Sequence, residues 1–116
     1  MKRDFDVIRE VLLKIEASDR RRPMYRMIEI DGYSSDDVDY NIDLLIKNQF
    51  IEATRRGKAL YMLKDITYKG HDLLDNIRDK GFFEKVKKYT SEKGIPLTFE
   101  TLKATVPIIA KTLLGG

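Results

Sequence analysis

The chain has 116 residues, of which 22 are Lys or Arg and 19 are Asp or Glu, so its net charge is only +3. This length suits a single domain, and a hydrophobic content of 42% is enough to fill a core. The absence of cysteine excludes disulfides, thiol nucleophiles and cysteine-bound zinc, and a single histidine excludes a multi-histidine metal site. No apolar run approaches the ~18 residues that span a bilayer. We therefore expect a cytoplasmic protein with no cofactor and no membrane association.

The first half begins with an amphipathic helix over residues 4–17. Its apolar stripe consists of Phe5, Ile8, Val11, Leu12 and Ile15. A charged loop over residues 18–23 follows the helix. Residues 24–34 alternate less cleanly and favour either a short strand or a poorly formed helix, and the pattern leaves both options open.

A second helix is predicted to begin at Ser34 or Ser35 and to end near Asn48. Its inward side consists of Val38, Ile42, Leu45 and Gln49, with Ile46 beside them, and its outward side of Asp36, Tyr40, Asp43 and Lys47. Residues 50–67 then alternate around Arg56-Gly57. This pattern predicts a β-hairpin with a basic tip.

Three more helices are predicted after the hairpin. Thr67 caps the first, residues 82–94 form the second, and Thr98 caps the third, in which Pro107 should introduce a kink or a restart. We assign residues 1–80 to one domain and residues 81–116 to a helical extension packed on it as a single structural unit. The last helix keeps apolar residues outside its main stripe, which favours either a homodimer through this helix or coverage of the core.

The predicted order of helix, short extended piece, helix, basic hairpin and helix is that of a winged-helix domain. Residues 34–53, SSDDVDYNIDLLIKNQFIEA, resemble the recognition-helix region of small bacterial winged-helix repressors. In both, a serine-led helix with a Leu-Leu pair is followed by a hydrophobic residue and the wing. The resemblance implies a fold that is mainly α with a small β-hairpin, a winged helix-turn-helix with two extra C-terminal helices.

A second resemblance covers the whole chain. Residues 1–16, 31–53, 66–79 and 85–114 are similar to a family of small bacterial and prophage proteins that is classified as a domain of unknown function. This resemblance implies a winged-helix fold and a bacterial or phage source. It implies no assigned activity.

Binding of double-stranded DNA, as in a transcription regulator, is the first functional hypothesis. Basic side chains at the hairpin and in the loop over residues 18–23 are suited to contact phosphates. The candidate DNA-contacting residues are Arg20, Arg21, Arg22, Tyr40, Lys47, Arg55, Arg56 and Lys58. Contacts from the hairpin and the arginine loop alone predict about four to six phosphates and a slope of log affinity on log salt of about −4 to −5. The alternative interpretation is a solvated turn whose charges prevent edge-strand pairing.

The acidic side of the second helix opposes this hypothesis. Residues 27–50 hold six acidic residues and one lysine, a net charge of −5. A carboxylate about 6 Å from a phosphate is repelled by about 0.7 kcal/mol in water and by about 3 kcal/mol at an effective dielectric constant near 20. Asp36, Asp39 and Asp43 therefore support an alternative, a protein-interaction module that docks a basic protein surface and binds no DNA. The simplest interpretation of Asp36 and Asp37 is that they favour the helix dipole and solubility.

Catalysis is not expected from this sequence. His71, the only histidine, falls in the first turn of a predicted helix. No pair of a nucleophile and a base surrounds it in the sequence. We interpret His71 as a packing or capping residue and expect that the protein is not an enzyme.

Overall fold

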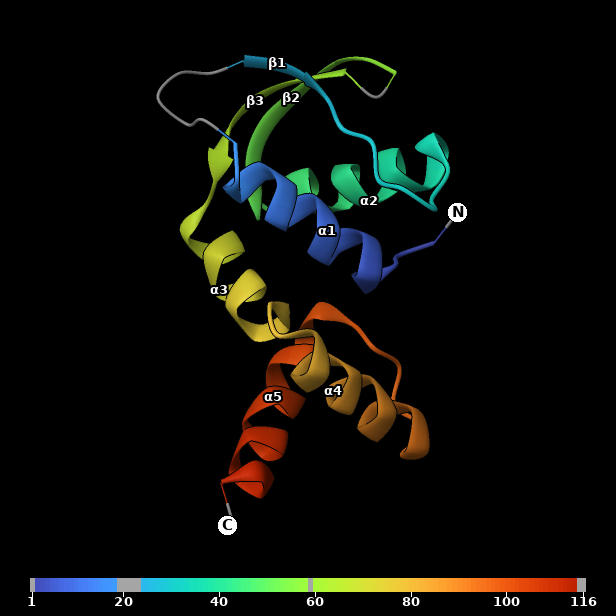
Figure 1. Cartoon of the computed structure of the whole chain (residues 1–116), viewed down its shortest axis with the longest axis vertical. Helices are drawn as coiled ribbons and strands as arrows, with labels where there is room; N and C mark the ends of the chain where they lie inside the picture. Colours follow the sequence, from blue (N-terminus) through green and yellow to red (C-terminus); the bar gives the residue numbers. More distant parts are fainter. Residues whose placement is uncertain (1, 19–23, 59, 115–116) are drawn as a thin grey trace. The chain divides into compact units, whose positions relative to one another are not determined.

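The computed structural model describes residues 2–18, 24–58 and 60–114. Over these residues the protein forms five helices and one small antiparallel sheet (Figure 1). The order is α1 (Phe5–Glu16), β1 (Met24–Met27), α2 (Ser35–Lys47), β2 (Ile51–Gly57), β3 (Leu60–Ile66), α3 (Tyr68–Ile77), α4 (Lys80–Glu92) and α5 (Phe99–Leu113). The predicted class, mainly α with a small β-hairpin, is confirmed.

The chain divides into two compact units, Met1–Leu74 and Asp75–Gly116, and the division falls within α3. The first unit contains α1, α2 and the sheet, and the second contains α4 and α5. The domain boundary after residue 80 and the packing of residues 81–116 on the first domain stay predictions.

The start of α1 is bound to α2 by hydrogen bonds. Asp4 caps α1, because its Oδ1 atom accepts the backbone N–H groups of Asp6 at 2.9 Å and Val7 at 3.4 Å. The backbone N–H of Asp4 in turn donates to Oδ1 of Asn41 at 2.8 Å, and Nδ2 of Asn41 donates to the carbonyl of Asp37 at 2.8 Å. Asn41 is fully buried, so these bonds satisfy a polar side chain inside the core.

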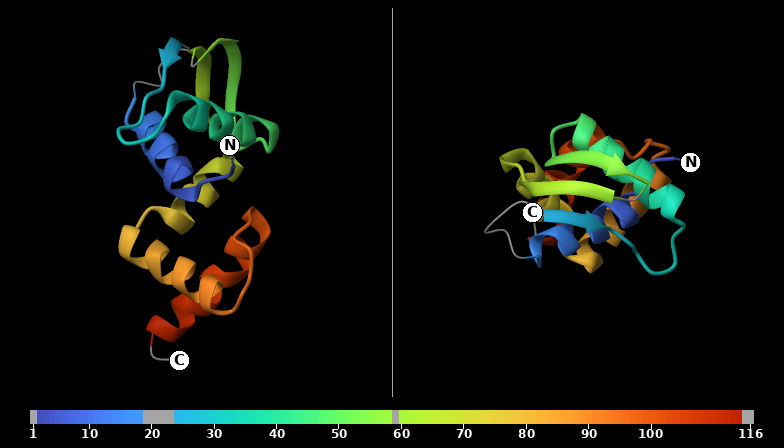
Figure 2. Two further views of the ribbon diagram at one scale, coloured as in Figure 1. Left: turned by 90° about the vertical axis from the view of Figure 1, so that its right-hand side faces the viewer. Right: turned by 90° about the horizontal axis from the view of Figure 1, so that it is seen from above.

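The sheet has three strands in the order β1-β3-β2. The segment that the sequence left open between strand and helix forms β1, which pairs antiparallel to β3 with Met24 opposite Leu63 and Met27 opposite Leu60. Figure 2 shows the three strands side by side over α1 and α2. α1 packs against β3, and α2 packs against β2 and α1. The predicted hairpin is therefore present, with β1 added to its β3 edge.

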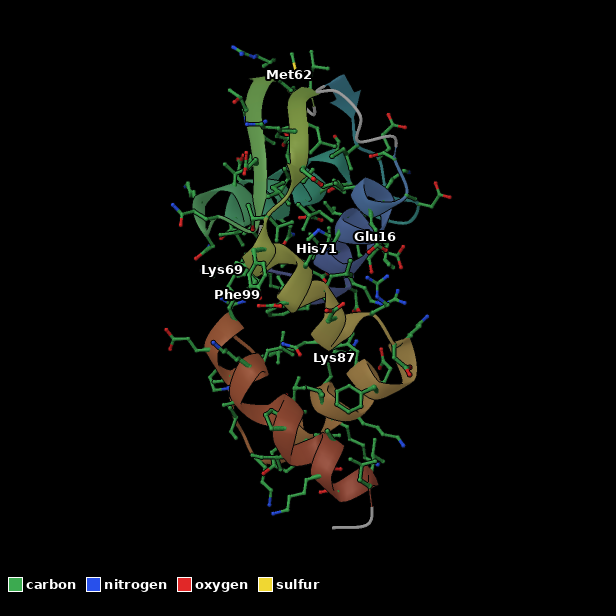
Figure 3. All side chains as sticks on the ribbon, turned by 90° about the vertical axis from the view of Figure 1, so that its left-hand side faces the viewer. Glu16, Met62, Lys69, His71, Lys87 and Phe99 are labelled. Atoms are coloured by element: carbon green, nitrogen blue, oxygen red, sulfur yellow. The ribbon has the colours of Figure 1, made fainter. Side chains whose placement is uncertain are left out.

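The core of the first unit lies between the helices and the sheet. Its buried side chains include most of those predicted to face inward from the first two helices: Phe5, Ile8, Val11, Leu12, Ile15, Val38, Ile42 and Leu45. Each such side chain contributes roughly 1.5–3 kcal/mol when it leaves water. Gln49 is exposed just beyond the end of α2, so its predicted inward position is wrong. On β3 the buried residues are Tyr61, Leu63 and Ile66, whereas Met62 is half-exposed and points away from the helices (Figure 3).

The connection from α2 to β2 depends on one residue in a left-handed conformation. Gln49 has φ of +61°, and the N–H of Phe50 donates back to the carbonyl of Leu45 at 2.8 Å. This is the geometry of a helix C-terminus for which glycine is the preferred residue. The turn sends the chain directly from the end of α2 into the hairpin.

The start of α3 is fitted against the same turn. Thr67 caps α3 by accepting the N–H of Gly70 at 3.0 Å, as predicted, and its hydroxyl donates to the carbonyl of Gln49 at 2.6 Å. A Cβ atom added to Gly70 would lie 1.9 Å from the carbonyl oxygen of Phe50. Glycine is therefore required at position 70 for this close approach.

In the second unit, α4 packs against α5. Phe83 and Val86 from α4, and Leu102 and Ile109 from α5, are its buried hydrophobic residues on these helices. Thr98 caps α5 as predicted by accepting the N–H of Thr101 at 3.0 Å. Pro107 lies inside α5, which continues to Leu113, so the proline does not end the helix. None of the helices in the described part of the chain is long and apolar enough to cross a membrane.

Candidate functional site

The centre of the candidate site is Arg55, which joins the hairpin to α2. Its NH1 atom lies 2.9 Å from Oδ2 of Asp39, and its NH2 atom lies 2.6 Å from Oδ2 of Asp43. One guanidinium group thus bridges two carboxylates that are one helical turn apart on α2. We call Arg55, Asp39 and Asp43, together with Tyr61, the hairpin clamp.

The strand register explains why Arg55 reaches α2. Arg55 lies directly opposite Tyr61 in the β2–β3 ladder, so the two side chains share one face of the sheet. That face also carries the buried side chains of Ile51 and Leu63. The guanidinium carbon of Arg55 lies 5.1 Å from the centroid of the Tyr61 ring, which is a cation–π contact.

Tyr61 completes the hairpin clamp from inside the core. It is fully buried, and its hydroxyl donates to Oδ1 of Asp39 at 2.5 Å. Asp39 therefore receives one donor on each oxygen, and its side chain is only 13% exposed. Burial first, and then the hydrogen bond to Asp39, raise the pKa of Tyr61 well above its ordinary value of 10.0. The hydrogen bonds to Asp39 and then Asp43 also raise the pKa of Arg55.

The raised pKa of Tyr61 predicts a loss of stability at high pH. The folded state favours the protonated phenol, so this contribution is complete below pH 10 and is lost as the pH rises toward the pKa of the folded protein. We expect the melting temperature to fall less between pH 8 and pH 11 in Tyr61→Phe than in the wild type. Tyr68→Phe is the control, because Tyr68 is 86% exposed and should leave the alkaline loss unchanged. Equal losses in all three proteins would contradict the prediction.

The tip of the hairpin carries two more basic residues, Arg56 and Lys58, which are exposed to solvent. Nζ of Lys58 lies 3.6 Å from Oδ1 of Asp36, and the two side chains are 74% and 64% exposed. Arg56 is exposed and is the extra residue in a β-bulge, because Arg55 pairs with Tyr61 and Gly57 pairs with Leu60. No ion pair of Arg56 occurs within the described ranges.

The other predicted site residues are not gathered into this cluster. Lys47 is exposed in the last turn of α2, at the opposite end from Asp36. Tyr40 is half-buried, although its position on the helix predicted an outward contact residue. Arg20, Arg21 and Arg22 lie outside the described residues. The structure therefore brings Asp36, Asp39 and Asp43 close to Arg55 and Lys58. The sequence pattern alone predicts a protein-binding role for the three aspartates and a DNA-binding role for the two cations.

The described part of the chain offers few other groups that are suited to metal binding or catalysis. No group of three or more Asp, Glu or His side chains there is arranged to hold a metal ion. His71 lies on α3 and is half-buried, and its N–H donates to the carbonyl of Thr67 at 2.9 Å as part of the helix start (Figure 3). The hairpin clamp and the tip cations are therefore the candidate functional groups among the described residues.

Comparisons with known proteins identify the family. A family model described as "Hypothetical protein (DUF2513)" matches residues 2–96. An uncharacterized protein of Haemophilus influenzae is 29% identical over 118 residues, which cover 99% of this chain and all of the relative. No solved structure matches the chain. The chain thus belongs to the small bacterial family DUF2513, in agreement with the resemblance to a domain of unknown function.

Proposed function

We propose that the protein is a winged-helix, transcription-regulator-like module that binds double-stranded DNA through the tip of its hairpin. The order α1, β1, α2, β2, β3, α3 supports the winged-helix assignment, because the hairpin directly follows the helix that occupies the recognition position. The proposed contacts are Arg56 and Lys58 at the tip, with Lys47, Tyr40 and the arginines at positions 20–22 as further candidates.

The observation that carries the proposal is the pairing of the aspartates of α2 with cations of the hairpin. Taken alone, these carboxylates would repel each approaching phosphate by about 0.7 to 3 kcal/mol at 6 Å. Arg55 lies between two of them, and Lys58 lies beside the third. The cluster of three carboxylates and two cations has a net charge of −1. The electrostatic objection to a duplex near the hairpin is therefore much smaller than the sequence indicated.

The same ion pairs weaken the alternative of an acidic docking surface. A basic partner protein would have to compete with Arg55 for Asp39 and Asp43, which already accept charge-assisted hydrogen bonds. Asp39 is also only 13% exposed. The proposed role is therefore DNA binding, in the bacterial or phage context and cytoplasmic location expected from the sequence, and it requires no catalysis.

A homodimer through α5 belongs to the same proposal. The end of α5 exposes Ile108, Leu113 and Leu114 by 48%, 50% and 87%. A two-fold dimer presents two copies of a DNA-binding element to two half-sites, which is the usual arrangement for helix-turn-helix proteins.

A salt-dependent duplex titration tests the proposed function. The full chain should bind a duplex of mixed sequence with a slope of log affinity on log salt of about −4 to −5. Arg56→Ala should weaken binding and make the slope shallower by about 0.9, because one phosphate contact is lost. The control is Lys85→Ala, which removes the same charge from an exposed position on α4 and should change neither quantity. Absence of duplex binding by the wild type at 50 mM salt would overturn the proposal.

A further inference from the structure

The two adjacent arginines of the hairpin differ in what surrounds them. Arg55 is held by two carboxylates and a tyrosine ring, whereas Arg56 is exposed at a bulge. We infer that Arg55 is a positioning residue that holds the hairpin on α2, and that Arg56 and Lys58 make the phosphate contacts. This inference rests on the proposed function and divides its residues into two roles.

Three of the five N–H donors of the Arg55 guanidinium already bond within the protein. NH1 donates to Asp39 and, at 3.4 Å, to the carbonyl of Gly57, and NH2 donates to Asp43. A move of this group to a phosphate would break its ion pair with Asp39, whose carboxylate is mostly buried. Breaking an ion pair at a mostly buried carboxylate is strongly unfavourable. Arg55 therefore stays on α2 when DNA approaches.

Lys58 is under no such restraint. Its ion pair with Asp36 joins two side chains that are mostly exposed to solvent at 3.6 Å, and such pairs contribute very little. A phosphate can replace Asp36 as the partner of Lys58 at almost no cost. Arg56 has no ion pair to break among the residues that the structure describes.

Arg55 also contacts the part of the hairpin that carries the tip cations. The contact from Arg55 to the carbonyl of Gly57 reaches the end of β2, immediately before Lys58. The hairpin clamp thus fixes the strand end that carries both tip cations. Loosening it should misplace Arg56 and Lys58 without removing either charge.

The variant Asp39→Asn separates positioning from contact by the sign of its effect. Asp39 accepts from Tyr61 on one oxygen and from Arg55 on the other, and an amide can accept on only one side. The variant therefore loosens the hairpin clamp while it removes a negative charge near the DNA. If Arg55 positions the hairpin, the affinity for the duplex should fall, because contact groups must be held within about 0.5 Å of their productive geometry. If Asp39 instead withholds Arg55 from DNA, the affinity should rise and the salt slope should steepen by about 0.9.

The titration uses the full chain, with circular dichroism to confirm folding at the temperature of measurement. Asp37→Asn is the matched control, because it removes the same charge from α2 and Asp37 has no ion pair within the described ranges. It should bind the duplex as tightly as the wild type or slightly more tightly. Asp43→Ala, which removes the acceptor of Arg55 NH2 at a side chain that is 40% exposed, gives a second loosening variant if Asp39→Asn fails to fold. It should also weaken binding.

The outcomes distinguish this inference from the proposed function. Weaker binding by Asp39→Asn or Asp43→Ala with intact binding by Asp37→Asn supports the positioning role. Tighter binding by the loosening variants overturns the positioning role and leaves DNA binding in place. A wild type that binds no duplex overturns both.

Discussion

Replacement of Gly70 by alanine is expected to destabilise the first unit by about 3 kcal/mol, near the upper end of the cost of overpacking. The new Cβ atom would lie 1.9 Å from the carbonyl oxygen of Phe50 and 2.6 Å from Cγ2 of Ile66. Neither neighbour is a flexible side-chain end, so the backbone of α3 or of the α2–β2 connection must move. A urea titration followed by circular dichroism at 222 nm measures the free energy of unfolding.

Gly81→Ala provides the matched control for this substitution. Gly81 also lies within a helix, but the nearest atom to its added Cβ is Oδ1 of Asp79 at 3.4 Å. Alanine favours the helical conformation over glycine by about 0.5–1 kcal/mol, so this variant should be at least as stable as the wild type. Equal stability of Gly70→Ala and Gly81→Ala would show that α3 does not approach Phe50 as closely as described.

Removal of Arg55 is expected to produce the second large effect, a loss of about 2 kcal/mol in Arg55→Ala. Breaking a fully buried ion pair costs about 3–5 kcal/mol, and an exposed pair contributes at most about 1 kcal/mol. The hairpin clamp lies between these limits, because Asp39 is 13% exposed and Arg55 is 35% exposed. The melting temperature should fall by roughly 5–15 °C.

Arg56→Ala is the natural control, since it makes the same chemical change one residue away. Its side chain is exposed, so its effect on stability should stay within about 0.5 kcal/mol. A double-mutant cycle of Arg55→Ala with Asp39→Ala adds a direct measure of the interaction between the two residues. A coupling of zero, or equal losses from the two arginine variants, would contradict the structural role of the clamp.

Much of the fold follows from the sequence because local signals agree with packing. The stripe over Val38, Ile42 and Leu45 fixes the buried side of α2, and Thr67 and Thr98 mark helix starts. Asn41 was missed although it occupies an inward position three residues after Val38. A polar residue at such a place indicates a buried hydrogen-bonding role, and its partner at Asp4 is known only from the tertiary structure.

The strand faces were harder to predict because the ladder is irregular. The register shifts between the pairs Glu52–Asp65 and Ala53–Leu63, so simple alternation from Tyr61 and Leu63 fails to predict that Ile66 is buried as well. Bulges depend on how both strands meet, which no single strand reveals. The presence of the hairpin could therefore be predicted, but not its register.

The candidate site could be predicted only in part. Arg55 comes four residues after Ile51 and two after Ala53, so it should lie on the same face of the strand as both. Asp39 and Asp43 are one helical turn apart and should share one face of their helix. Both halves of the hairpin clamp can therefore be recognised in the sequence. Their contact depends on the tertiary packing of α2 against β2. The sequence pattern alone therefore predicts that Arg55 contacts DNA and that the aspartates bind a basic protein. In the structure, Arg55 and the aspartates instead form ion pairs with each other.

The left-handed Gln49 and the hairpin clamp together limit how this molecule can be re-engineered. The hairpin cannot be moved to another protein by itself, because its orientation depends partly on the preceding helix. A graft onto another scaffold must carry the whole segment from Ser34 to Ile66, with both aspartates, or supply equivalent acceptors. The smallest segment that can be moved to another protein with its hairpin geometry intact is thus α2 together with β2 and β3.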